Sequence, residues 1–183
     1  MSEFIYVDNS NVFIEGKRIA AVRHGLAKSA AHANTNDIAD HDFRLDFGEL
    51  YDFVSENNPG KVARALLFGS GVSENDKVWQ IAERAGFEAV VVSRNAENRE
   101  KKVDTGIVAA MVRDAYTRAD KARDTITLVA GDSDYVPAVE ILVSDGFRVE
   151  VVFWSSASAE LNSVCSRFIE LDRHLDKLEY DNA

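Results

Sequence analysis

The sequence predicts an α/β fold around a mostly parallel β-sheet, and two observations lead to this prediction. Five short, mostly apolar runs are typical of buried strands, and they span 4–8, 62–68, 87–93, 125–131 and 147–154. Segments with apolar residues at helical spacing lie at 47–57, 72–86, 103–119 and 135–146. Strands nearly continuous in Val, Ile, Leu, Phe and Ala are covered on both faces. Regular alternation of strand and helix then indicates β-α-β units and a parallel sheet.

Two segments depart from this alternation. Residues 15–45 mix Ala, His, Asn and Asp, and we expect a helix followed by a long loop. Residues 158–180 are expected to form one or two helices, with 168–171 as a short edge element. No low-complexity linker interrupts the 183 residues, which is the length of one ordinary domain. The sequence therefore predicts a single domain, 1–183, with an insertion at about 15–45.

Composition and charge restrict the class of protein. Hydrophobic residues make up 46% and charged residues 28%, which is typical of a globular protein. No apolar run approaches the roughly 20 residues of a membrane span, and no secretory signal is visible. The single Cys165 has no Cys or His at metal-site spacing beside it. We expect a cytoplasmic protein without a membrane partner. The net charge of −10 argues against a protein that coats nucleic acid, but it leaves room for a local basic patch.

Acidic residues follow two of the predicted strands. The first strand ends at Asp8, and the fourth is followed by Asp132 and Asp134. Asp104 stands at the start of the predicted helix 103–119. Ligands of parallel sheets bind at the carboxyl ends of the strands, near the point where strand order reverses. We therefore expect these four acids to converge at one edge of the sheet.

Converging carboxylates repel each other unless a cation compensates them. Oxygen ligands of this kind suit Mg²⁺ or Mn²⁺ rather than zinc, and the four histidines lie outside the constellation. A cation of this kind activates a bound water and polarises a phosphate oxygen. The acids therefore favour metal-assisted hydrolysis of a phosphodiester bond.

Each acid also has a structural interpretation. Asp132 and Asp134 could cap the helix that follows them, and Asp104 could cap its own helix. Asp8 could be a turn residue that binds its own backbone. Two acids in Gly-Asp-Ser-Asp at one strand end, together with Asp8 from another strand, favour the metal site over these alternatives.

Three segments, YVDNSNVF, KKVDTGIVAAMV and LVAGDSDYVPAVEILVSDGFRVEVVFW, resemble the NYN domain in its LabA-like branch. That family is part of the PIN-like nuclease superfamily, and the resemblance extends from about residue 4 to residue 171. It implies a Rossmann-like three-layer α/β/α sandwich, a divalent-metal site and a role in cutting RNA. The catalytic and metal-binding residues that it implies are Asp8, Asp104, Asp132 and Asp134, with Asn11 and Ser133 in support.

Basic residues precede Asp104 and could bind the phosphates of a single-stranded RNA. They are Arg94, Arg99, Lys101 and Lys102. A second basic segment, 17–28, has the ordinary interpretation of a solvated helix face.

We therefore expect a metal-dependent ribonuclease. The alternative is a regulatory or scaffold module of weak activity, which the charge of −10 favours. Asp114 cannot strengthen the acid group, because ten helical residues separate it from Asp104 by about 15 Å. A haloacid-dehalogenase-like phosphatase is disfavoured, because its second aspartate would stand where this chain has Ser10. A homodimer through the C-terminal helices is left open.

Overall fold

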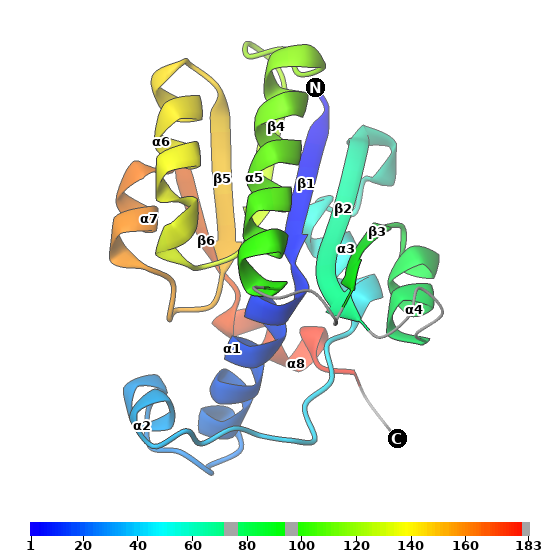
Figure 1. Cartoon of the computed structure of the whole chain (residues 1–183). Helices are drawn as coiled ribbons and strands as arrows, with labels where there is room; N and C mark the ends of the chain where they lie inside the picture. Colours follow the sequence, from blue (N-terminus) through cyan, green and yellow to red (C-terminus); the bar gives the residue numbers. More distant parts are fainter. Residues whose placement is uncertain (72–76, 94–98, 181–183) are drawn as a thin grey trace.

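A parallel sheet of six strands forms the centre of the protein (Figure 1). The computed structural model describes residues 1–71, 77–93 and 99–180, excluding the side chains of 93 and 99–101. The strands are β1 (Glu3–Asp8), β2 (Val62–Gly71), β3 (Glu88–Ser93), β4 (Thr125–Val129), β5 (Arg148–Phe153) and β6 (Arg167–Glu170). Every neighbouring pair is parallel, in the order β3-β2-β1-β4-β5-β6. The order therefore reverses between β1 and β4, which is the switch point of a doubly wound sheet.

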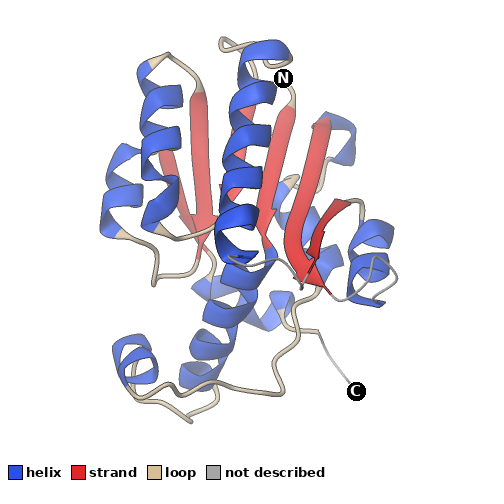
Figure 2. Cartoon of the chain, in the orientation of Figure 1, coloured by secondary structure: helices blue, strands red, loops and turns tan. Residues whose placement is uncertain are grey.

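Helices cover both faces of this sheet, and the result is a three-layer α/β/α sandwich (Figure 2). One face carries α5 (Arg99–Thr117), α6 (Val136–Ser144) and α7 (Ala159–Val164). The other carries α1 (Asn9–Arg23), α3 (Phe47–Val54), α4 (Lys77–Ala85) and α8 (Leu175–Leu178). The remaining short elements are α2 (Ala30–Thr35), η1 (Pro59–Lys61), η2 (Ser133–Tyr135) and η3 (Asp172–His174).

The alternation of side chains along β1 explains why its sequence is apolar throughout. Phe4 and Tyr6 enter the core beneath α5 and α6, whereas Ile5 and Val7 enter the core on the opposite face. Both sets are buried, as expected for a strand covered on both sides. The sequence-based prediction of an α/β sandwich with a parallel sheet is confirmed.

The predicted strands are all present, and the segment 168–171 does contribute an edge strand, β6. Several boundaries differ by a few residues, and two of these differences matter most here. Helix α5 begins at Arg99 rather than at 103, and β2 continues to Gly71 rather than ending at 68. Glycines at the end of β2 look like turn residues in the sequence, yet a Cβ at Gly69 would lie only 2.3 Å from the ring of Trp79. Residues 72–76 of the predicted helix 72–86 lie outside the described residues.

The segment 15–45 is more helical than expected. Its first part completes α1, and α2 follows after a turn. Ala21, Ala27 and Ala33 form a small core between the two helices. The chain then runs to Leu45, which forms an antiparallel bridge with Glu179. In the described parts of the chain, no helix has the length and apolar character needed to cross a membrane.

His24 joins three parts of the chain at the end of α1. Its Nδ1 lies 2.7 Å from Oδ2 of Asp40, and its Nε2 lies 3.4 Å from Oε2 of Glu179. The hydrogen bond with Asp40, followed by the charge of Glu179, raises the pKa of His24. The same bond lowers the pKa of Asp40. His24 is also the C-cap of α1, where a positive charge is favoured.

This contact makes part of the stability depend on pH. Because the folded pKa of His24 is raised, its contribution is full below the unfolded pKa of about 6.5 and is lost as pH rises through the folded value. The contribution of Asp40 is lost at the acid end, as pH falls through its lowered pKa. We expect His24→Gln to reduce the free energy of unfolding by less than about 1 kcal/mol at pH 6 and to have no effect at pH 9.

Urea denaturation at the two pH values measures this difference. His41→Gln is the matched control, because His41 is an exposed histidine of the same segment. An equal loss for His24→Gln at pH 6 and pH 9 would contradict the prediction.

Candidate metal centre at the carboxyl edge of the sheet

Asp8 is the last residue of β1 and the N-cap of α1. Its Oδ1 accepts a hydrogen bond from the backbone N–H of Asn11 at 3.1 Å. The side chain is only 5% exposed, so a carboxylate is held almost entirely within the protein. The interpretation of Asp8 as a residue that binds its own backbone is therefore correct, but it accounts for one oxygen only.

Asn11 connects this end of β1 to the end of β4. Its Oδ1 accepts a hydrogen bond of 2.8 Å from the N–H of Gly131. The carbonyl of Gly131 in turn accepts from the N–H of Ser158, also at 2.8 Å. A Cβ at Gly131 would lie 2.1 Å from the ring of Phe153. The start of the loop that carries Asp132 is thus fixed on several sides.

Asp132 is the N-cap of η2, and its Oδ1 accepts from the N–H of Asp134 at 3.1 Å. The hydroxyl of Ser133 lies 3.5 Å from the same oxygen. All three side chains are exposed. The capping interpretation therefore applies to Asp132, and Asp134 lies in the first turn that it caps.

Asp104 is not an N-cap. Because α5 begins at Arg99, Asp104 lies inside the helix, in its second turn. The side chain is half-buried, and its Oδ1 lies 3.1 Å from the hydroxyl of Tyr135. The interpretation of Asp104 as a helix cap is wrong. The first turn of α5 is polar, so the apolar pattern in the sequence places the start of the helix too late.

Tyr135 brings Asp8 and Asp104 together. Its hydroxyl contacts Oδ2 of Asp8 at 2.9 Å as well as Oδ1 of Asp104. One signal for this residue is present in the sequence, an aromatic directly after Gly-Asp-Ser-Asp, but nothing in the sequence indicates where its hydroxyl points.

The four acids influence one another electrostatically. The pKa of Asp104 is raised to about 6, first by burial and then by the carboxylates of Asp8, Asp132 and Asp134, whereas the hydrogen bond from Tyr135 opposes the rise. Burial also raises the pKa of Asp8, with a smaller contribution from Asp132. In the part of the chain that the structure describes, no basic side chain offsets these two shifts, and a cation would do so.

The carboxylate oxygens of this site fit a hard cation that takes only a few of its ligands from the protein. Within residues 1–71, 77–93 and 99–180, no three His, Cys, Asp or Glu side chains are close enough to hold one ion together. Mg²⁺ needs only one or two protein carboxylates, because waters and substrate phosphates complete its shell. The pair of Asp8 and Asp104 provides such a set, with Asp132 and Asp134 close enough to affect its charge. Zinc would require nitrogen or sulfur ligands instead.

The predicted basic residues are only partly described. Arg94 lies outside the described residues, and Arg99 and Lys101 lie in the first turn of α5, where only the backbone is described. Lys102 is exposed, two residues before Asp104.

The other basic segment, 17–28, has partners within the chain. Lys17 lies over the ring of Phe13, with 4.5 Å between its Nζ and the ring centroid. Arg18 pairs with Glu15, and Arg23 pairs with Asp176. These contacts agree with the interpretation as a solvated helix face.

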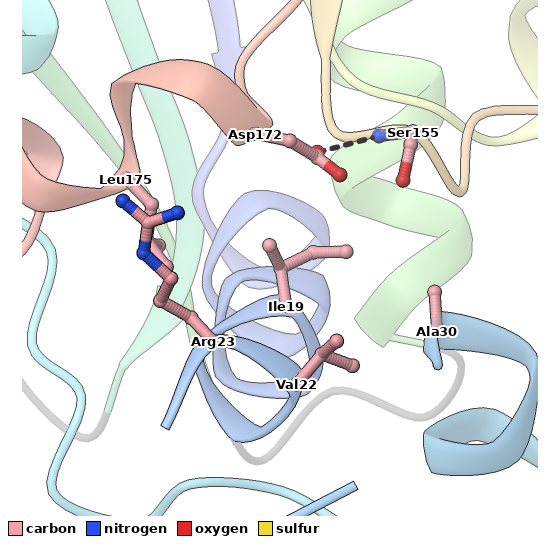
Figure 3. Close-up of a pocket in the computed structure, with 7 residues that line it drawn as sticks. All are labelled: Ile19, Val22, Arg23, Ala30, Ser155, Asp172 and Leu175. Atoms are coloured by element: carbon pink, nitrogen blue, oxygen red, sulfur yellow. Dashed lines mark hydrogen bonds between the residues drawn. The ribbon is translucent and has the colours of Figure 1, made fainter. Parts of the chain in front are cut away.

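A hollow of about 290 Å³ lies beside α1, at the far end from Asp8 (Figure 3). Ile19, Val22, Ala30 and Leu175 give it an apolar lining. None of the predicted site residues lines this hollow. It is therefore separate from the acidic edge, the edge of the sheet that carries Asp8, Asp104, Asp132 and Asp134.

A doubly wound parallel sheet with acids at its switch point defines a Rossmann-like α/β protein with a site at the carboxyl edge. The model of the NYN domain matches residues 4–172, and the chain therefore belongs to the NYN domain family, within the PIN-like nuclease superfamily. Curated protein sequences give no match. One similar solved structure is the crystal structure of a protein of unknown function from Vibrio parahaemolyticus. It has a TM-score of 0.66 and 18% identity, over 98% of this chain and 96% of that chain, which supports the fold alone.

The tight packing at Gly131 leads to a prediction about stability. Gly131→Ala should lower the free energy of unfolding by about 1–3 kcal/mol, because the new methyl group forces Phe153 to move. Gly60→Ala is the control, since a Cβ there meets only the Asn58 side chain, at 3.4 Å. Chemical denaturation measures both, and equal stability of the two variants would count against the packing argument.

Proposed function

We propose that the protein is a metal-dependent ribonuclease that hydrolyses RNA phosphodiester bonds at the carboxyl edge of the sheet. One observation carries this proposal. Two acids from separate elements, Asp8 and Asp104, meet at one hydroxyl at the switch point of the sheet. Burial of carboxylates is costly when no cation contacts them, and the described residues place no basic side chain on either acid. A bound cation would explain the arrangement.

The acids at this edge would have different tasks. Asp8 and Asp104 would hold Mg²⁺ or Mn²⁺, and the exposed Asp132 and Asp134 would complete the site from the solvent side. The cation would supply an activated water and a counter-charge for the phosphate. Asn11 would keep the ends of β1 and β4 in register through Gly131. Ser133, close to Asp132, would orient a carboxylate or a water.

The substrate that fits best is single-stranded RNA. Lys102 is exposed two residues before Asp104 on α5 and would pair with phosphate oxygens, together with Arg94, Arg99 and Lys101. Membership of the NYN domain family supports a nuclease. We further propose the LabA-like branch and a cytoplasmic location, on the motifs and composition of the sequence.

A module of weak activity is the second candidate. It is favoured because, in the described part of the chain, no three His, Cys, Asp or Glu side chains are placed to hold one ion together. Such a protein would bind Mn²⁺ without cleaving RNA, and the experiment below separates the two.

Asp8→Asn and Asp132→Asn test the proposal. Asparagine caps helices as well as aspartate does, so the fold is retained while one negative charge is removed. We expect each variant to lower the rate of Mn²⁺-dependent cleavage of mixed single-stranded RNA by at least about 100-fold. The melting temperature of Asp8→Asn should be unchanged or higher, since the variant no longer buries a charged carboxylate.

Asp52→Asn is the matched control, an exposed aspartate on α3. Loss of cleavage in both site variants but not in Asp52→Asn supports a nuclease. Mn²⁺ binding without cleavage by the wild-type protein supports the weak module. Cleavage that persists in Asp8→Asn would indicate a contaminating enzyme and would remove the support for this site.

Lys102→Ala tests the contact with RNA. Each phosphate contact with a single strand contributes about 0.7 to the slope of log affinity against log salt concentration, and we expect the variant to lose about this amount. Fluorescence anisotropy with labelled RNA, without divalent cations, measures the slope while the RNA stays intact. Lys177→Ala, which removes an exposed lysine from α8, should leave the slope unchanged. The same slope for Lys102→Ala and the wild-type protein would exclude this contact.

A further inference from the structure

Tyr135 is a fully buried side chain whose polar atom contacts two acids. Its exposed fraction is 0%, and its ring packs in the core between the sheet, α5 and α6. The hydroxyl lies 2.9 Å from Oδ2 of Asp8 and 3.1 Å from Oδ1 of Asp104. Tyr135 is the last residue of η2 and directly follows Asp134 in the sequence. Its hydroxyl thereby links the acid of β1 to the acid of α5.

Core packing alone does not explain this hydroxyl. A phenylalanine would fill the same space without requiring a polar partner. A tyrosine hydroxyl has one proton, so it cannot donate a full hydrogen bond to two carboxylates at once. The contact also requires Asp8 and Asp104 to approach each other, and nearby carboxylates repel. The arrangement is therefore costly for the fold, and it needs another explanation.

The orientation of the oxygens provides one. Asp8 is held at both oxygens, by the N–H of Asn11 on Oδ1 and by Tyr135 on Oδ2. Asp104 is held by the same hydroxyl. Each carboxylate oxygen has two lone pairs, so an oxygen that accepts one hydrogen bond can still bind a cation. Two oxygens on one Mg²⁺ lie within about 4 Å of each other, which is a spacing that a shared hydroxyl can enforce.

The geometry points to Tyr135 as a positioning residue, which uses its hydroxyl to hold Asp8 and Asp104 at the spacing at which both bind one divalent cation. This inference rests on the proposed function and goes beyond it, because it assigns the preorganisation of the site to a residue that touches neither cation nor RNA. Hydrogen-bonding partners of metal ligands commonly contribute 10–100-fold to metal affinity.

Tyr135→Phe removes the hydroxyl and keeps the ring, so the core remains filled. We expect it to raise the Kd for Mn²⁺ by about 10-fold or more, measured by isothermal titration calorimetry on the full chain. We also expect the cleavage rate of Tyr135→Phe to return towards the wild-type rate as Mn²⁺ is raised to saturation. A side chain that only stabilised the core would show neither effect.

Tyr6→Phe is a closely matched control. Tyr6 is also fully buried in the same core, and its hydroxyl donates to Oδ2 of Asp114 at 3.0 Å. Both variants lose one buried hydroxyl beside an aspartate, and thermal melts verify that both are folded. We expect the Kd for Mn²⁺ of Tyr6→Phe to equal that of the wild type.

The outcomes are distinct. Weaker Mn²⁺ binding by Tyr135→Phe alone supports the inference. If the wild type binds Mn²⁺ and Tyr135→Phe binds it equally well, or if both variants are weakened equally, the inference is wrong while the proposed function stands. If the wild type binds no Mn²⁺ at all, the proposed metal site fails, and the positioning role is overturned with it.

Discussion

The parallel pairing of β1 with β4 is the constraint on which the acidic edge depends. Val7 is paired with Val129, so both strands end at the same level and their loops leave at one edge. Asp8 and the loop with Asp132 therefore emerge side by side, although most of the chain separates them. Helix α5 packs across β1 and β2 and enters from this edge, which brings Asp104 to the same place. The topology alone concentrates negative charge at the switch point.

Much of this could be predicted from the sequence, because the features involved are periodic. Nearly continuous apolar runs such as 62–68 and 125–131 identify strands buried on both faces, and their alternation with helices fixes a parallel sheet. Parallel strands place their carboxyl ends on one side of the sheet, so the sequence alone predicts that acids following these strands lie at one edge. The start of α5 could not be found in this way, because its first turn, Arg-Glu-Lys-Lys, has no apolar residue to reveal a helical period.

The apolar pattern of the sequence does not predict where the polar atom of a buried side chain points. An aromatic residue after Gly-Asp-Ser-Asp is expected in the core, and the ring of Tyr135 is indeed there. Its hydroxyl reaches Asp8 and Asp104 only because η2 turns the chain back over the end of the sheet. The alternatives given for these acids, a helix cap at Asp132 and a bond to its own backbone at Asp8, do not compete with a metal site. Each cap orients a carboxylate whose remaining lone pairs stay available.

The two acids of α5 show how a structural carboxylate differs from a functional one. Burial opposes ionisation of Asp114, but hydrogen bonds from Arg64 and Tyr6, at 2.8 and 3.0 Å, lower its pKa below the usual value. The protein itself compensates that charge. At Asp104 burial and the neighbouring carboxylates together raise the pKa to about 6. A fold gains nothing from acids that it buries and then leaves to repel one another. Among the described side chains no basic group pairs with Asp104, and the cation of the proposed site would supply that positive charge.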